Sequence, residues 1–147
     1  MRLHVAFLIL LASCAGPQEE MPGRSHLTSN PVFNKYIEQF EAYRGMRDQQ
    51  NIAVAFESLE APDVGKCIKY EDGRRVIKID PYFWDNSVEI VKSALMFHEL
   101  GHCELDLEHN KGKYSDGCPV SIMNDYIPVE DCLMYYWDDY INQLFNR

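Results

Sequence analysis

The residue types best suited to chemistry stand together at positions 98 to 102, which read His-Glu-Leu-Gly-His. On a helix, two histidines four residues apart lie on one face and can direct their imidazole nitrogens at one metal ion. Glu99 then lies beside the metal, where its carboxylate can accept a proton from a zinc-bound water. The spacing therefore predicts a zinc site with His98 and His102 as ligands and Glu99 as general base.

The sequence around this motif also favours a metal. Hydrophobic residues cover the expected helix nearly all round, so the helix belongs inside the fold. Buried imidazoles need partners for their ring nitrogens, and a metal ion supplies one. Gly101 stands inside the helix, where glycine costs roughly 1 kcal/mol relative to alanine. We therefore expect some group to approach the backbone at Gly101.

A catalytic zinc site needs a third protein ligand and an open position for water. The nearby candidates are Asp106, Glu108 and His109. His109 is the natural choice, because it brings three of the five histidines within twelve residues. Glu108 stays open as an alternative, since carboxylates bind zinc at similar distances. Asp106 is either solvated or orients a ligand histidine.

These residues resemble the metzincins, a clan of zinc metallopeptidases. The pattern of that clan is H-E-x-x-H-x-x-G-x-x-H, followed downstream by a tight turn that places a methionine beneath the metal. Ser121-Ile122-Met123-Asn124 looks like that turn. The chain departs from the pattern because Leu105 occupies the glycine position and Glu108 the position of the third histidine. We interpret it as a variant with a connection one residue longer, in which His109 is the third ligand.

The resemblance implies a zincin-like α+β fold, in which a small mixed sheet packs on a buried active-site helix between N- and C-terminal helices. It implies zinc-dependent hydrolysis of peptide bonds in a peptide or protein substrate. By the same resemblance, the strand near residues 75 to 79 would edge the cleft and pair with the substrate as an added strand. Tyr126 is either an ordinary tyrosine or, as in some metzincins, a donor to a developing oxyanion.

Two other hypotheses stay open. The chain could be a non-catalytic, zinc-containing surface lipoprotein that binds peptide or a protein partner, although zinc binding alone does not need Glu99. The site could instead be gluzincin-like, with a distant third ligand such as Glu130. Substitution of Glu99 tests the first hypothesis, and substitution of His109 and Glu130 with metal content as the readout tests the second.

The elements expected to position the motif follow from periodicity and turn residues. Asn86 and Glu89 resemble a capping box, which predicts that the motif helix begins at Asn86 and ends near Cys103. Glu71-Asp72-Gly73 predicts the turn of a hairpin. The other expected elements are a helix over 31–46, strands over 52–56, 67–70 and 75–79, irregular chain to about 127 and a helix over 130–145.

The N-terminus predicts export. The apolar run over residues 5–12 is too short to span a bilayer. It ends in Leu-Ala-Ser-Cys14, which resembles the lipobox of bacterial lipoproteins, whose signal is cut before the cysteine that receives the lipid. The resemblance implies a signal peptide over 1–13, a tether over 14–29 and a domain over 30–147. It places the protein in the bacterial cell envelope, attached to a membrane through Cys14, with the outer membrane favoured because Ala15 is not aspartate.

Four cysteines remain after Cys14, and none is in a C-x-x-C pair. An even number in an exported chain predicts two disulfides, with three possible pairings. We favour Cys103 with Cys118 and Cys67 with Cys132.

Composition sets limits on function. With 147 residues, 46% of them hydrophobic, the chain is long enough for one folded domain. A net charge of −9 repels phosphate backbones and argues against nucleic acid as a partner.

Overall fold

The computed structural model describes residues 30–45 and 52–146. They form a mixed α+β fold, so the predicted fold class is confirmed at that level. The expected signal peptide, Cys14 and the tether lie outside the described residues.

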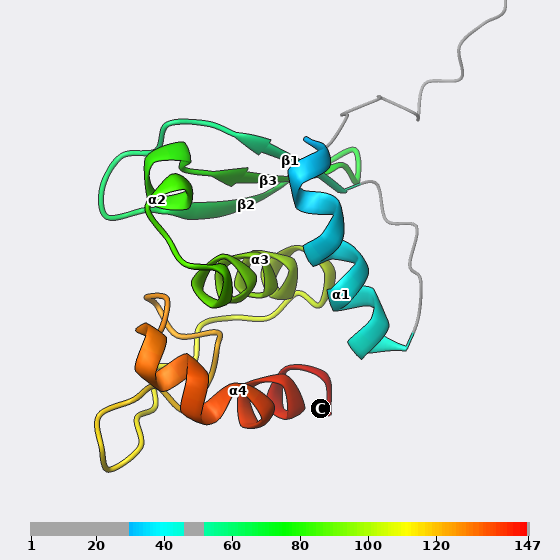
Figure 1. The fold of residues 1–147 in the computed structure, drawn as a ribbon. Coiled ribbons are helices and arrows are strands. Elements are labelled where there is room, and N and C mark those ends of the chain that lie inside the picture. The colour runs from blue at the N-terminus through cyan, green and yellow to red at the C-terminus, as the bar shows by residue number, and fades with distance from the viewer. Residues whose placement is uncertain (1–29, 46–51, 147) are drawn as a thin grey trace, which may run out of the picture.

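Three layers make up the fold (Figure 1). The sheet covers one side of helix α3 (Glu89–Glu104), and helix α4 (Glu130–Phe145) lies on the other side. Helix α1 (Asn34–Arg44) follows the short 3-10 helix Pro31–Phe33 and packs across the layers. The bounds of α4 are those predicted from the sequence. Helix α1 ends because Gly45 adopts a left-handed conformation with a φ of 71°.

The sheet contains strands β1 (Ile52–Phe56), β2 (Gly65–Lys69) and β3 (Arg75–Ile79), in the order β1-β3-β2. Strand β1 is parallel to β3, and β2 is antiparallel to it. The predicted hairpin is present, and Gly73 takes a φ of 84° in its turn. The expectation that the strand over 75–79 edges the cleft is wrong, because β3 is central and bonded on both sides. Strands β1 and β2 are the two edge strands of the described sheet, and β2 is the one that lines the pocket.

The start of α3 also differs from the prediction. A short helix α2 (Pro81–Asp85) precedes it, capped by the Asp80 side chain, which accepts a hydrogen bond from the Phe83 amide. Asn86 is the C-cap residue of α2, and its side chain donates to the Tyr82 carbonyl oxygen. The Asp-Pro pair is itself a helix start signal, since proline suits the first helical position.

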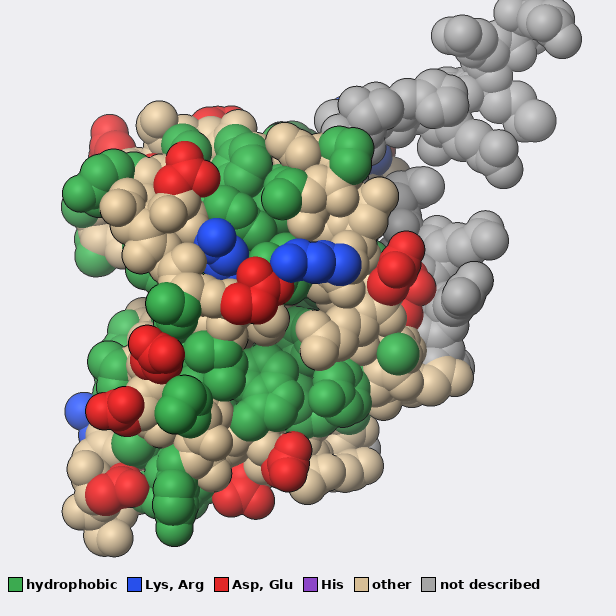
Figure 2. Space-filling view, viewed as in Figure 1, with side chains coloured by type: hydrophobic (Ala, Val, Ile, Leu, Met, Phe, Trp, Pro, Cys, Tyr) green, Lys and Arg blue, Asp and Glu red, His purple; other side chains and the backbone are tan. Residues whose placement is uncertain are grey.

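Helix α3 is the centre of the core. Every residue from Ser93 to Gly101 is buried, as expected for a helix that is apolar nearly all round. No helix in the described part of the chain combines the length and apolar composition needed to cross a membrane. On the face shown in Figure 2, hydrophobic side chains gather over α3 and α4, and charged side chains lie where the sheet meets α3.

Two disulfides form, as predicted, but the favoured pairing is wrong. The structure joins Cys67 to Cys103 and Cys118 to Cys132. Cys67 lies on β2, which packs directly on α3, so its partner is the cysteine at the end of that helix. Cys118 lies in the long loop after α3, and its bond to Cys132 attaches that loop to α4.

Candidate metal centre

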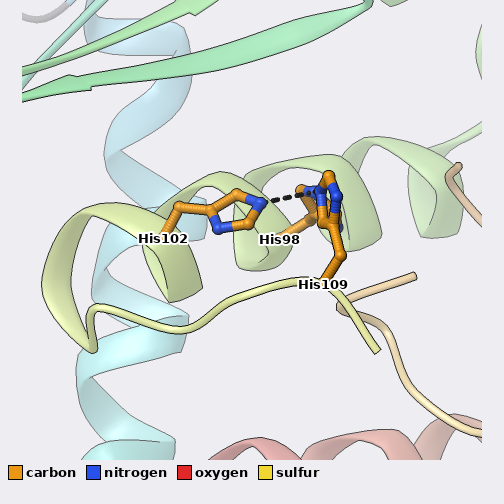
Figure 3. A group of neighbouring side chains, drawn as sticks. All are labelled: His98, His102 and His109. Atoms are coloured by element: carbon orange, nitrogen blue, oxygen red, sulfur yellow. Dashed lines mark hydrogen bonds between the residues drawn. The ribbon is translucent and has the colours of Figure 1, made fainter. Parts of the chain in front are cut away.

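Three histidines converge at the end of α3 (Figure 3). His98 and His102 lie one turn apart on the helix, and His109 lies in the loop that follows. The Nε2 atom of His98 lies 3.0 Å from His102 Nε2 and 3.3 Å from His109 Nε2. One ligand atom from each residue lies within 4.8 Å of the other two, so the cluster could hold a metal ion.

Backbone carbonyl oxygens orient two of these rings. His98 Nδ1 lies 2.8 Å from the Ile122 carbonyl oxygen, and His102 Nδ1 lies 2.6 Å from that of Leu107. A carbonyl oxygen only accepts hydrogen bonds, so each Nδ1 carries the proton and each Nε2 presents a lone pair. Burial lowers the pKa of His98 to about 4 and also lowers the pKa of His102, so both rings are neutral at pH 7.

This proton arrangement provides a test of whether the residues fit a metal. Two neutral Nε2 atoms that both present lone pairs cannot hydrogen-bond to each other, yet those of His98 and His102 are 3.0 Å apart. A cation bound between the two nitrogens would accept both lone pairs and so remove the repulsion between them. The donor set therefore fits a metal ion, and the Nδ1 contacts are the outer-shell bonds that ligand histidines usually make.

A turn at Asp106 directs His109 toward the helix. Leu105 has a φ of −104°, whereas Asp106 has a φ of 53° and takes the left-handed conformation. In the pattern H-E-x-x-H-x-x-G-x-x-H the glycine position is that of Leu105, so the turn in this chain comes one residue later. From Asp106 to His109 the interval is three residues, as between the motif's glycine and its third histidine. This displacement accounts for the later histidine.

The other predicted candidates lie elsewhere. The carboxylate of Asp106 lies 2.6 Å from Lys69 Nζ and 3.3 Å from an Arg75 nitrogen, so it orients no ligand histidine. Glu108 is exposed and lines the same pocket, but it is not a member of the cluster. Glu130 is exposed at the start of α4 and does not line the pocket.

Met123 lies against the helix at Gly101, which meets the expectation of a close approach. A Cβ atom on Gly101 would lie 2.5 Å from Met123 Sδ, so only glycine leaves room for this side chain. Met123 is fully buried, and its backbone amide donates to Ser121 Oγ at 3.2 Å. The Asn124 amide donates to the Ser121 carbonyl oxygen, which closes a tight turn over these residues.

Glu99 lies next to the histidines and is only 4% exposed. The backbone amide of Cys67 acts on its carboxylate in favour of the ionised form, and Oε2 has no partner among the described residues. Burial, with a smaller contribution from the charge of Asp63, raises the pKa of Glu99 to about 8. A buried polar atom without a partner is costly, so this oxygen points to a bound group such as water.

The histidines and Glu99 line one pocket of about 580 Å³ between β2 and the loop after α3. Tyr126 lines it too and is 44% exposed. The sequence interpretation missed the contribution of β2, from which Gly65 and Cys67 reach Glu99. One signal was available, because a glycine in a strand often marks close approach of another group.

Comparison of the chain with protein-family models, with curated proteins and with solved structures gave no match. The case for a function therefore depends on the chemistry of the pocket. That chemistry includes a possible metal site and a buried carboxylate beside it.

Proposed function

We propose that the protein is a zinc-dependent metallopeptidase with a zincin-like, metzincin-like domain. The observation that carries the proposal is that Glu99 shares a pocket with three converging imidazoles. It is buried there with one oxygen that has no partner in the described part of the chain. Holding a metal does not require this carboxylate, and its burial carries a desolvation cost. A general base beside the metal gives the carboxylate a role.

The metal would be zinc held by His98, His102 and His109. Two nitrogen ligands at about 2.0–2.1 Å from a tetrahedral zinc lie about 3.3 Å apart, close to the 3.0 and 3.3 Å separations from His98 Nε2. Three protein ligands leave one position open, which is typical of catalytic zinc. Bound zinc would polarise the scissile carbonyl and lower the pKa of a water molecule.

The chain's own groups would then carry the proton. The positive charge of a bound cation would keep the Glu99 carboxylate ionised despite its burial. Oε2 would then accept a proton from the water that attacks the peptide carbonyl carbon. The same oxygen delivers that proton to the amine nitrogen as the carbon–nitrogen bond breaks, so the carboxylate ends the reaction ionised. The Nδ1 contacts of His98 and His102 hold both rings in place throughout.

Strand β2 offers a place for the substrate. Its pairing with β3 uses one edge, and the other edge borders the pocket through Gly65, Lys66 and Cys67. An extended peptide that adds to this edge would lie beside Glu99. The substrate would therefore pair with β2 rather than with the strand expected from the sequence.

We further propose that the protein works in the bacterial cell envelope, anchored through a lipid on Cys14. Two disulfides are typical of a protein in an oxidising compartment. The net charge of −9 makes nucleic acid an unfavourable partner.

Metal content and cleavage of fluorophore-labelled casein, measured on the full chain, test the proposal. We expect about one zinc per chain after dialysis and cleavage that stops with a chelator and returns with added zinc. Glu99→Gln should keep the zinc and lose cleavage about 100- to 10,000-fold. Glu130→Gln, the same change outside the pocket, should alter neither.

Two results would contradict the proposal. A wild-type chain without metal under non-chelating conditions would remove the site. Zinc held by the wild type with no cleavage would indicate the non-catalytic zinc lipoprotein instead.

A further inference from the structure

Strand β2 lies along one row of α3 side chains. Leu95, Glu99 and Cys103 are spaced four residues apart and therefore share a face of the helix. Gly65 and Cys67 are two residues apart and share a face of the strand. The two rows meet three times, at Gly65 with Leu95 and Glu99, at the Cys67 amide with Glu99, and at the Cys67–Cys103 disulfide.

Gly65 is glycine for reasons of space. A Cβ atom there would lie 2.5 Å from Glu99 Oε1, 2.7 Å from Leu95 Cδ1 and 2.9 Å from Glu99 Cδ. Its backbone does not adopt the left-handed conformation seen at Gly45 and Gly73, so conformation alone would allow any residue. The position thus excludes a side chain because the Glu99 carboxylate occupies that volume.

The backbone of Cys67 is free to hold this carboxylate. Tyr70 and Val64 form ladder hydrogen bonds with Arg74 and Asp80 across the hairpin. In an antiparallel pair such bonds involve alternate residues, so the N–H of Cys67 points away from β3. It is therefore available to donate to Glu99.

We propose that Gly65 is a positioning residue for Glu99, which it allows to lie under β2 within reach of the Cys67 amide. The inference rests on the proposed role of Glu99 as general base. Alanine at position 65 would displace the carboxylate, because the far end of a flexible side chain moves more easily than the strand. A displacement of about 1 Å costs about 100-fold in rate when a reacting group is misplaced.

Gly65→Ala and Gly112→Ala make a matched pair in the full chain. A Cβ atom on Gly112 would lie 2.6 Å from Val120 Cγ2, so the steric conflict is similar, but Gly112 does not line the pocket. We expect both variants to keep zinc and both disulfides. Turnover of labelled casein should fall about 100-fold in Gly65→Ala and stay near the wild-type value in Gly112→Ala. Equal turnover in the two variants would overturn the proposal.

Binding of acetohydroxamic acid to the cobalt-substituted protein, followed by visible absorption, gives a readout that needs no turnover. The hydroxamate hydroxyl can donate to a carboxylate beside the metal. We expect Glu99→Gln and Gly65→Ala each to weaken binding about tenfold or more, and Gly112→Ala to leave it unchanged. If the wild type cleaves nothing, the proposed function fails, and this binding alone decides the role of Gly65. Unchanged binding in Gly65→Ala would refute it.

A second pair covers the case in which Gly65→Ala does not fold. Cys67→Pro with Cys103→Ala removes the amide donor, whereas Cys67→Ala with Cys103→Ala keeps it, and both lack the disulfide. Proline is tolerated on an edge strand where the N–H is outside the ladder. We expect the proline variant to bind the hydroxamate about tenfold more weakly than the alanine variant. Equal affinities would show that the amide does not position Glu99.

Discussion

Two faces of helix α3 contribute side chains to the pocket, and these side chains are held in different ways. On the face toward the loop, His98 and His102 are each fixed by a backbone carbonyl oxygen. On the face toward β2, Glu99 is under the influence of the Cys67 amide but keeps one oxygen without a partner among the described residues. The strand is joined to α3 by the Cys67–Cys103 disulfide, and the loop is joined to α4 by the Cys118–Cys132 disulfide.

The difference matches what each face would do. A metal ligand works best when its ring is held through the nitrogen that does not bind the metal. A general base needs a fixed position and one oxygen reserved for the proton. Changes on the loop face should therefore affect metal affinity, and changes on the strand face should affect turnover.

The largest effect should come from the ligand that the loop contributes. His109→Ala removes one of three converging nitrogens. Zinc affinity should fall more than about 100-fold, since changes behind a ligand already cost about 10- to 100-fold. Glu108→Gln, one residue away, should keep its zinc. Competition with a chromophoric chelator measures both, and stronger loss in the Glu108 variant would make that carboxylate the ligand.

Removal of either disulfide should have the next largest effect, on stability. The bonded cysteines are 14 residues apart in the loop pair and 36 in the strand pair. Their replacement by alanine should lower the free energy of unfolding by about 3 and 4 kcal/mol. Denaturant titration measures this change. Turnover should fall only without the strand disulfide, and an equal fall in the loop variant would contradict the division between faces.

Gly101→Ala should have a smaller effect, on the loop face. The new Cβ would press on Met123, next to the residue whose carbonyl oxygen holds His98. Overpacking should cost about 1–3 kcal/mol, and zinc affinity should fall about tenfold. Gly65→Ala, the strand-face counterpart, should leave zinc affinity unchanged. Calorimetric zinc titration of the two variants would show whether the faces are separate.

The smallest effect, on stability, should come from the turn at Asp106 that directs His109 toward the helix. Asp106→Gly and Asp106→Ala both remove the contacts to Lys69 and Arg75. They differ at the left-handed φ of 53°, which glycine adopts without strain. The glycine variant should be more stable than the alanine variant by about 1 kcal/mol in urea titration. Equal stabilities would show that this conformation does not limit the turn.

Much of the fold could be read from local patterns. Periodicity predicted α4 with its bounds, the strand over 52–56 and the hairpin. The capping pattern at Asn86 misplaced the start of α3, because Asn86 is instead the C-cap of the helix that the Asp-Pro pair begins. Both signals are local, and in the structure Asp80 caps the start of α2 whereas Asn86 caps no helix start.

The sequence by itself determined which residues could bind a metal. Histidines four apart on a helix share a face whatever surrounds them, and a glycine inside that helix indicated a close approach. Tertiary structure alone decided the disulfide pairing, the central place of β3 and the contact of Gly65 with Glu99. These features join segments far apart in the chain, and local spacing contains no information about which segments meet when the hydrophobic core forms.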